Sequence, residues 1–523
     1  SSAASDVYKR QARIFSAAVS RYVLSLNPAI EPALKEWLAS GKEGEMLSML
    51  NRNDNLKQLV LAATPWVQDA QSDEERISRL ALLFDSKEID SSIKSAVRKL
   101  EKMQRDGGGW SWTDNYDRPS EWATMLILNN FAELRQLGCC PSQLDSMVKK
   151  ALKYIDAEVA KSYAKYPESD YSYYTYVRSL YRDVPMSTGA QKAYNATVQR
   201  TLKDWKKSST PAKAADALML YRNDYKEVAR QILTSIREYA VSTPELGLWW
   251  DSVDGSSWRS LTAVGQTAFI LQAFNTIEPG CAEIDPIRQW LILNKIVQDW
   301  GTSVDASACV AAILQCGSSW LNRPGDAVIT VDGKRLESDR MDRLTGQVIA
   351  AIPDAKGNLK ITRTAEGPAW GAVVSQSTQV MKDVKAHSIP ELSVSKELFV
   401  RTDKGWAPAD SFAVGQVVKV RLVMKSMRDM DYVTLVDNRA ATFEPVVQTP
   451  RPVYCDGLVF YLENRDAATN LFIDRMPKGQ YVIEYEMNVN NAGTYSSGIA
   501  TLQSQYAPEM TAHSAGTALT VTD

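Results

Sequence analysis

Three carboxylates in an aromatic stretch are the residues of this sequence best placed for acid–base chemistry. Asp114, Asp117 and Glu121 follow Trp110 and Trp112 at short spacing, and pairs of carboxylates act as acid and base in glycoside hydrolysis. The same three residues precede a run of apolar side chains, where short polar and acidic residues commonly cap the start of a helix. Capping explains them without catalysis, and we favour that interpretation.

The sequence shows no cysteine nucleophile with a histidine nearby to act as its general base. Cys139 and Cys140 are adjacent, with no histidine near them in the sequence, so we expect buried or loop thiols. The only histidines are His387, which precedes Ile389-Pro390 in a linker and is expected at the surface, and His513 near the C-terminus. No Ser–His–Asp set can be drawn from them. The six cysteines are too few and too irregular for a disulfide framework or a zinc site. We therefore predict no catalytic residues, no metal and no cofactor.

Glycine and tryptophan mark the loops that separate predicted helices. Gly107–Gly109 lacks the Lys-Ser/Thr of a phosphate-binding loop, and a flexible turn before Trp110 is expected instead. Twelve of the fourteen tryptophans precede residue 323. Tryptophan stacks on sugars, but at the junctions of helical hairpins it more often fills the gap between them. Trp110, Trp112, Trp249 and Trp250 are the candidate aromatic-loop residues.

A helical tract must position these loops. From residue 12 to 322 apolar residues recur at a period of 3.6, with a capping box at Ser72-x-x-Glu75 and a start signal at Thr210-Pro211. No convincing alternating strand interrupts the tract. An aromatic loop followed by a helix of small and apolar residues occurs three times, beginning at Gly109, Gly247 and Asp299. Such repeats predict stacked helical hairpins or a closed α/α toroid.

Two layers of helices are expected in that toroid. The helices after the aromatic loops carry little charge and should form the buried inner layer, whereas the amphipathic segments 85–102 and 221–239 should form the outer layer.

After Pro324 the hydrophobic period changes from 3.6 to 2. A hairpin is predicted around Asp332-Gly333, and alternation at Val418, Val420, Leu422 and Met424 predicts a strand with one buried face. The fold class is therefore multidomain α + β, an α/α toroid followed by antiparallel β-sandwich domains. We divide the β part into a small segment (323–392) and a C-terminal sandwich (393–523).

The first eleven residues look foreign to this pattern. Residues 1–11 have no apolar period and no signal-peptide cleavage pattern. Asp6–Gln11 resembles the translation of a transposon end used in sequencing libraries. We expect an artefactual leader, or a short disordered terminus, with natural sequence from Ala12.

Composition excludes several other classes of protein. The 523 residues carry 60 Lys plus Arg against 62 Asp plus Glu, a formal charge of −2, and no basic run appears. A nucleic-acid-binding chain usually shows a basic excess, so no nucleic-acid partner is expected. No stretch of eighteen apolar residues that could span a membrane occurs either.

Three blocks of the sequence are similar to the C-terminal part of bacterial α2-macroglobulins. The first holds Thr64–Val67, Arg79–Asp85 and Gly108–Trp112, and the second holds Gln298–Trp300 and Thr302. The third and most specific runs from Asp429–Val433 through Asp437, Arg439-Ala440, Phe443–Pro445, Asp456-Gly457, Arg465–Ala467 and Pro477–Gly479 to Tyr506–Glu509.

The resemblance implies a trap for proteases rather than a catalyst. It implies a thioester-type toroid (12–322), part of a CUB-like β domain (323–392) and the terminal macroglobulin-like domain (393–523). In the family a cleaved bait region triggers closure, and a Cys-x-Glu-Gln thioester then acylates the protease. That motif is absent from this chain, and the place for it lies just before Ala12. Tyr506 matches the aromatic position that shields the thioester, although Gln505 stands where relatives often have Met.

The resemblance also implies proteases as partners, trapped through a bait region outside this chain, and a monomeric, periplasmic or membrane-tethered endopeptidase inhibitor of bacterial defence. One alternative is a polysaccharide lyase or hydrolase built from a toroid and a sandwich, which would need a His or Tyr base beside an acid or Arg. Tyrosines are plentiful at Tyr171, Tyr173, Tyr174 and Tyr176, but the toroid has no histidine. Another alternative is a scaffold that lacks the thioester and acts through contacts alone.

Overall fold

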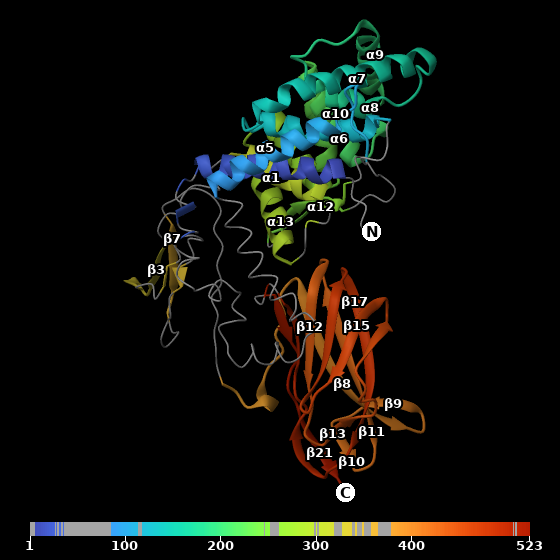
Figure 1. Cartoon of the computed structure of the whole chain (residues 1–523). Coiled ribbons are helices and arrows are strands. Elements are labelled where there is room, and N and C mark those ends of the chain that lie inside the picture. Colours follow the sequence, from blue (N-terminus) through green and yellow to red (C-terminus); the bar gives the residue numbers. More distant parts are fainter. Residues whose placement is uncertain are drawn as a thin grey trace. The chain divides into compact units, whose positions relative to one another are not determined.

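The computed structural model of the chain describes residues 6–26, 28, 31–32, 35, 85–112, 118–244, 246–251, 261–297, 300, 303–317, 327–336, 340–341, 348–349, 357–363, 378–505, 507 and 510–523. These residues fall into two compact units (Figure 1), a helical unit that also holds strands β1–β7 and a sandwich unit that holds strands β8–β21. Over the described ranges, no helix combines the length and the apolar character needed to cross a bilayer.

The first unit is built mainly from helices. They are α1 (Asp6–Leu26), α5 (Ser86–Met103), α6 (Glu121–Gln136), α7 (Asp145–Lys165), α8 (Ser172–Ser179), α9 (Thr188–Asp204), α10 (Thr210–Arg222), α11 (Lys226–Arg237), α12 (Ala263–Ile277), α13 (Ile284–Val297) and α14 (Ser303–Gln315). Short 3-10 turns at Ser142–Leu144 and Trp205–Lys207 precede α7 and α10.

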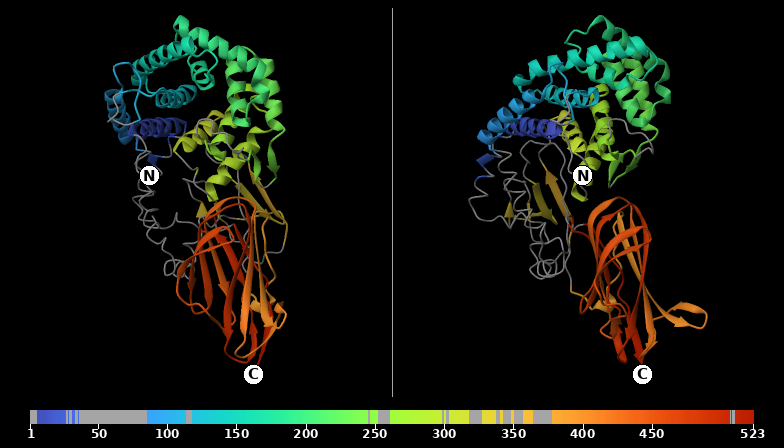
Figure 2. Two further views of the ribbon diagram at one scale, coloured as in Figure 1. Left: turned by 90° about the vertical axis from the view of Figure 1, so that its right-hand side faces the viewer. Right: turned by 45° about the vertical axis from the view of Figure 1, so that its right-hand side comes forward.

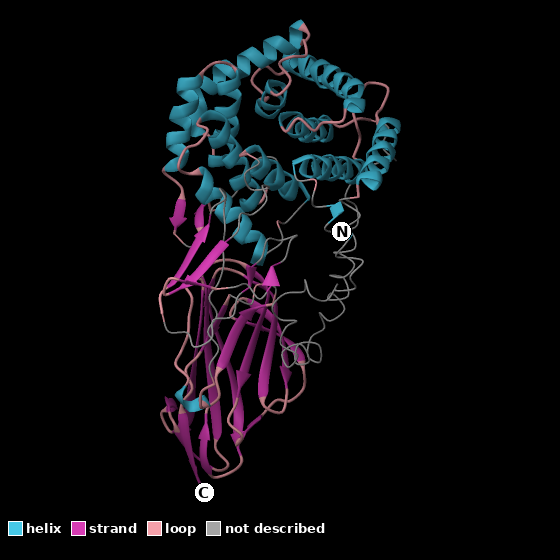
Figure 3. Cartoon of the chain, turned by 90° about the vertical axis from the view of Figure 1, so that its left-hand side faces the viewer, coloured by secondary structure: helices cyan, strands magenta, loops and turns pink. Residues whose placement is uncertain are grey.

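An inner layer of these helices closes on itself. Helix α6 packs on α8, α8 on α10, α10 on α12 and α12 on α14, while α14 packs on both α1 and α6 and α1 also packs on α6. Figures 2 and 3 show these helices arranged around a common centre. Two of these inner helices are buried on nearly all sides, as their low charge predicts: α6 is buried from Ala123 to Leu134 and α12 from Gly265 to Phe274.

The outer layer consists of α5, α7, α9 and α11, which pack against the inner helices with one face each. Helix α5 buries the stripe Ile89, Ile93, Ala96, Val97, Leu100 and Met103, and Asp85 caps its start by accepting hydrogen bonds from the amides of Lys87 and Glu88. The prediction of a helical tract with an amphipathic outer layer is confirmed. The segment 221–239 is wrong as a single helix, however: α10 ends at Arg222, and Asp224 has a left-handed φ of 68° before α11 starts.

Two further features of this unit differ from expectation. Strands β1 (Val241–Thr243) and β2 (Gly247–Trp249) form a short antiparallel hairpin inside the helical tract. Helix α1 begins at Asp6, within the leader 1–11 for which the sequence allowed disorder. Gln11 is fully buried, and its Oε1 accepts a hydrogen bond of 3.0 Å from Asn130 Nδ2 on α6. Residues 6–11 are therefore helical, which corrects the expectation of disorder.

The described strands of the predicted segment 323–392 form two small antiparallel sheets. Strand β3 (Ala327–Val331) pairs with β4 (Lys334–Arg335) and β7 (Leu359–Arg363), and β5 (Arg340–Met341) pairs with β6 (Val348–Ile349). Asp332 and Gly333 link β3 to β4 with φ values of 47° and 79°. Positive φ at both central residues of a two-residue loop matches the twist of the flanking strands, so the predicted hairpin is present.

The second unit is a sandwich of β-sheets. Its strands are β8 (Leu392–Thr402), β9 (Gly405–Pro408), β10 (Ser411–Ala413), β11 (Val417–Ser426), β12 (Met430–Asn438), β13 (Phe443–Pro445), β14 (Arg451–Cys455), β15 (Leu458–Asn464), β16 (Ala468–Met476), β17 (Gly479–Val489), β18 (Gly493–Ser496), β19 (Ala500–Ser504), β20 (Thr511–His513) and β21 (Ala518–Thr522). One sheet has the order β13-β17-β11-β8-β9 and the other β14-β15-β16-β12-β19-β20.

Alternation along the strands builds the core of this sandwich. Val418, Val420, Leu422 and Met424 of β11 are all buried, as predicted, between the two sheets. A third, three-stranded sheet has the order β10-β21-β18, in which β10 and β21 run parallel. The fold class is confirmed, apart from this parallel pair.

Candidate functional site

The predicted aromatic loops are packed junctions between helices. Trp110 is fully buried; its indole Nε1 donates to the carbonyl oxygen of Leu100 on α5 at 3.1 Å, and its amide donates to Thr124 Oγ1 on α6 at 3.0 Å. Through its side chain and its backbone amide, Trp110 thus connects the end of an outer helix to the start of the next inner helix. Trp110 therefore fills the gap between two hairpins.

The same arrangement recurs further along the tract. Trp250 Nε1 donates to Ile236 O on α11 at 2.9 Å, and Trp300 Nε1 donates to Leu291 O on α13 at 3.0 Å. In each case the indole reaches back to a carbonyl of the preceding helix. Trp249 stacks on Trp290, with ring centroids 6.0 Å apart. The sequence repeat therefore corresponds to a repeated tryptophan contact.

Trp112 is the exception among the four aromatic candidates, because 42% of it is exposed. Asp114 and Asp117 lie outside the described residues. Of the three carboxylates that the sequence offers as an acid and a base near Trp112, only Glu121 can be described.

Glu121 lies in the first turn of α6, where Ser120 supplies the cap by accepting a hydrogen bond from the Ala123 amide. A carboxylate in that turn is favourable to the helix dipole. Burial raises the pKa of Glu121, and the neighbouring Glu158 raises it further. A carboxyl group of this kind can hold a proton more firmly than a free one.

Tyr154 stands in the same region but does not complete a catalytic pair. Burial raises its pKa to about 12, and its hydroxyl donates to the carbonyl oxygen of Pro119 at 3.1 Å. The Tyr154 ring packs against Gly109, where any side chain would overlap it. A side chain at Gly108 would overlap the carbonyl oxygen of Lys150. Gly108 and Gly109 are required by these close approaches, so the expected turn before Trp110 is present and is tightly packed.

A Tyr–Arg–acid cluster of the type that a lyase uses is present, but it is inaccessible. Arg178 Nε lies 2.9 Å from Asp156 Oδ1, and the Tyr174 hydroxyl donates to the same oxygen at 2.8 Å. The Arg178 side chain is 0% exposed and that of Asp156 is 6% exposed. Burial raises the pKa of Tyr174. The cluster is a buried ion pair that fixes α8 on α7.

The thiols show no sign of activation. Burial raises the pKa of Cys139 and Cys281 to about 11 and that of Cys140 and Cys316 to about 12. A reactive cysteine needs the opposite shift, since the thiolate is the nucleophile. We refer to these four as the half-buried thiols. No cluster of three or more metal-ligating side chains occurs among the residues described.

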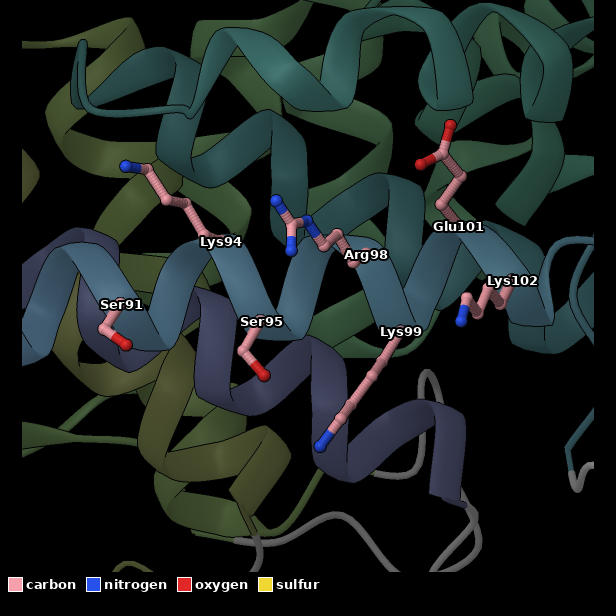
Figure 4. Close-up of a pocket in the computed structure, with 7 residues that line it drawn as sticks. All are labelled: Ser91, Lys94, Ser95, Arg98, Lys99, Glu101 and Lys102. Carbon is pink, nitrogen blue, oxygen red and sulfur yellow. The ribbon is translucent and has the colours of Figure 1, made fainter.

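The outer face of α5 is lined by charge. Figure 4 shows Lys94, Arg98 and Glu101 pointing to one side of the helix and Ser95 and Lys99 to the other. With Ser91 and Lys102, these residues border an open region of the surface rather than an enclosed cavity. All of them belong to α5, and this is the solvated side of a helix whose apolar stripe is buried.

The sandwich has its own buried ion pair. Lys396 Nζ on β8 lies 2.7 Å from Asp437 Oδ1 on β12, so the pair bridges the two sheets. The Tyr485 hydroxyl on β17 donates to Asp437 Oδ2, and Lys396 Nζ also donates to Asn438 O at 2.7 Å and Ser497 O at 3.0 Å. Sequence reasoning missed this cluster, because its members lie far apart in the chain.

Residues 392–509 of this sandwich match the family model described as the bacterial α2-macroglobulin MG10 domain. This part of the chain is similar to that domain, and we refer to residues 392–509 as the MG10 domain. The match begins at the first residue of β8 and covers the buried Lys396–Asp437 pair. The resemblance to this family is therefore confirmed for the block on which it most depends.

Solved structures similar to the chain include bacterial α2-macroglobulins. Salmonella α2-macroglobulin reacted with methylamine is 15% identical, with 84% of this chain and 28% of that chain covered and a TM-score of 0.35. Trypsin-activated Escherichia coli α2-macroglobulin is 15% identical, with 85% and 31% covered and a TM-score of 0.40. The chain thus spans less than one third of either relative. Native E. coli α2-macroglobulin from domain MG7 to the C-terminus is 13% identical, with 84% and 69% covered and a TM-score of 0.31. No curated protein matches the chain.

Tyr506, the candidate thioester-shielding residue in the MG10 domain, lies outside the described residues. Its neighbour Gln505 is described: the amide donates to Tyr432 O at 2.8 Å, and Oε1 accepts from Thr434 Oγ1 at 3.4 Å. Gln505 is thus held against β12, next to the point where β19 ends.

Proposed function

We propose that this chain is the C-terminal part of a bacterial α2-macroglobulin-like protein that traps proteases and that it catalyses no reaction itself. The observation that carries the proposal is the MG10 match over residues 392–509. The raised pKa values of the half-buried thiols and the buried Tyr174–Arg178–Asp156 cluster also favour a protein without a nucleophile.

The domains follow from the same proposal. Residues 12–322 are a thioester-type α/α toroid, residues 323–392 a CUB-like β segment and residues 393–523 the terminal macroglobulin-like sandwich. The inner helices that close on one another support the first assignment. The start of β8 at Leu392 supports the last boundary.

The parent protein is proposed to act outside the cytoplasm, as a periplasmic or membrane-tethered monomer that meets proteases there. Its thioester is proposed to lie in a part of the parent protein that this sequence does not include, because no Cys-x-Glu-Gln occurs in the 523 residues. Tyr506 is proposed to shield that bond, since excluding water protects a reactive ester-like group.

Extending the chain upstream to the parent protein's own start allows a direct test. We expect the extended protein, after treatment with trypsin, to block cleavage of a large protein substrate while small chromogenic substrates are still cleaved. That difference distinguishes a trap from an active-site inhibitor. If cleavage of the large and the small substrates is lost equally, or if neither is lost, the proposal is contradicted.

The thioester and its shield can be tested in the same protein. Methylamine should release one thiol, and Tyr506→Ala should speed this release, with Tyr495→Ala on β18 as a control outside the proposed shield. The lyase or hydrolase alternative predicts instead that the purified 523-residue chain cleaves a polysaccharide and that Glu121→Gln abolishes the cleavage.

A further inference from the structure

The only two histidines of the chain are neighbours in the sandwich. His387 and His513 are 126 residues apart in sequence, yet their ring centroids are 5.7 Å apart with an angle of 33° between the ring planes. Their backbones pair as an antiparallel bridge, in which each amide donates to the other's carbonyl at 2.9 Å. Residues paired in this way present their side chains on the same face of a sheet.

The backbone around the two histidines is held in place. His513 ends β20, the edge strand that pairs with β19. The Gly516 amide donates to Val384 O at 2.9 Å, and a side chain at Gly516 would overlap the carbonyl oxygen of Met381. Three backbone hydrogen bonds thus join the segment 381–387, just before the MG10 domain, to residues 513–516. The backbone positions of both histidines are therefore fixed by these hydrogen bonds.

The hydrogen bonds of the rings leave nitrogens for a ligand. His513 Nδ1 lies 3.1 Å from Ser514 O. When Nδ1 carries the proton, it donates to that carbonyl, and Nε2 keeps a lone pair that can bind a metal ion. A backbone carbonyl on one ring nitrogen is the usual support of a metal-bound histidine, because it fixes the tautomer and the orientation of the ring. His387 is exposed on the surface of the sandwich, so its ring can turn toward the same point.

The separation of the rings suits one tetrahedral ion. Two imidazoles bound to Zn²⁺ through metal–nitrogen bonds of about 2.0–2.1 Å place their ring centroids roughly 5 Å apart. The observed 5.7 Å requires only a small rotation of the exposed ring.

From these observations we infer that His387 and His513 form a binding site for a divalent transition-metal ion, Zn²⁺ being the reference case. The ion joins the segment that leads into the MG10 domain to the edge strand near the C-terminus. Water completes the coordination, because no third metal-ligating side chain gathers there among the residues described. The site is independent of protease trapping and of the thioester.

Two of four ligands from the protein imply moderate affinity, well below that of a four-ligand structural zinc site. Imidazole binds the ion only when it is neutral, so binding releases protons and weakens in acid. Copper should bind more tightly than zinc, and nickel is a practical third probe.

Isothermal titration of the tag-free 523-residue chain with ZnCl₂ at pH 7.5 tests the inference. We expect one ion per chain with a dissociation constant in the micromolar to submillimolar range, weakened at least tenfold at pH 5.5. His387→Gln should weaken binding at least tenfold, and His513→Gln should do the same. Lys385→Gln, a neighbouring exposed change, should leave it unchanged. Cys455→Ser, the cysteine of the sandwich, should also leave it unchanged.

Thermal unfolding gives a second measurement. Saturating Zn²⁺ should raise the Tm of the wild-type sandwich transition and leave that of His387→Gln unmoved, while the metal-free Tm values of the two proteins agree. Because His387 is exposed, this variant carries the test even if His513→Gln folds poorly. Stoichiometric binding that survives both histidine substitutions, or no binding at millimolar Zn²⁺, would overturn the inference.

Discussion

Asp216 on α10 is a buried carboxyl group that should make the stability of the helical unit depend on pH. Its side chain is buried, with 8% of the residue exposed, and Ser208 Oγ donates to its Oδ2 at 2.8 Å. Burial raises the pKa of Asp216 from the ordinary value of 3.8 to about 7; the Ser208 hydrogen bond opposes this shift and the charge of Asp170 adds to it. The carboxyl group is therefore protonated in the folded protein under mildly acidic conditions.

The pH dependence of stability follows from this shift. Between about pH 4 and 7 the folded chain holds a proton on Asp216 that the unfolded chain has released, so the free energy of unfolding falls as the pH rises. One pKa unit corresponds to about 1.4 kcal/mol, so a shift of roughly three units contributes up to about 4 kcal/mol. This contribution is present in full below about pH 4 and is lost above about pH 7.

Asp216→Asn removes the ionisation while keeping the oxygen that accepts from Ser208. We expect the variant to match the wild type at pH 4 and to be more stable by about 2–4 kcal/mol at pH 8. Urea unfolding at half-unit pH intervals, followed by far-ultraviolet circular dichroism, measures both curves. Asp106→Asn, in the exposed turn after α5, is the matched control and should leave the pH profile unchanged. Parallel profiles for wild type and Asp216→Asn would refute the reasoning.

Three further predictions concern the buried polar contacts of the same unit. Trp250→Phe leaves a buried carbonyl without its indole donor and should cost about 1–3 kcal/mol in urea unfolding, whereas Trp112→Phe at an exposed position should cost under about 0.5 kcal/mol. Arg178→Met leaves Asp156 buried without its cation and should lower stability by about 3–5 kcal/mol, seen as a lower urea midpoint. The half-buried thiols should react slowly with a disulfide reagent at pH 8 and rapidly after unfolding, because burial keeps them protonated; equal rates in both states would contradict this.

Local patterns in the sequence predict the elements well. Thr210-Pro211 marks the start of α10, because proline at the first turn needs no amide hydrogen bond. Alternation from Val418 to Met424 predicts the buried face of β11, because side chains alternate across a strand. Both signals depend on near neighbours in the chain.

Features that depend on distant segments could not be predicted in this way. The His387–His513 pair arises because the segment before β8 returns to the last strand of a six-stranded sheet. The tight packing of Gly108 arises from Lys150, on a helix that follows much later. The break at Asp224 interrupts a run of residues that suits one long helix, and the packing of α11 on α10 requires a turn there. Tertiary contacts override local preference at each of these places.

Closure of the inner helices affects how the helical unit unfolds. An open stack of helical hairpins exposes an apolar face at each end and needs polar end repeats to stay soluble. Because α14 packs on both α1 and α6, the described inner helices leave no open end from which fraying could begin. Detaching α1 uncovers apolar surface on α6 and α14 at once. Partial unfolding is therefore penalised at two interfaces, and the unit should lose its structure in one concerted step rather than peel from an end.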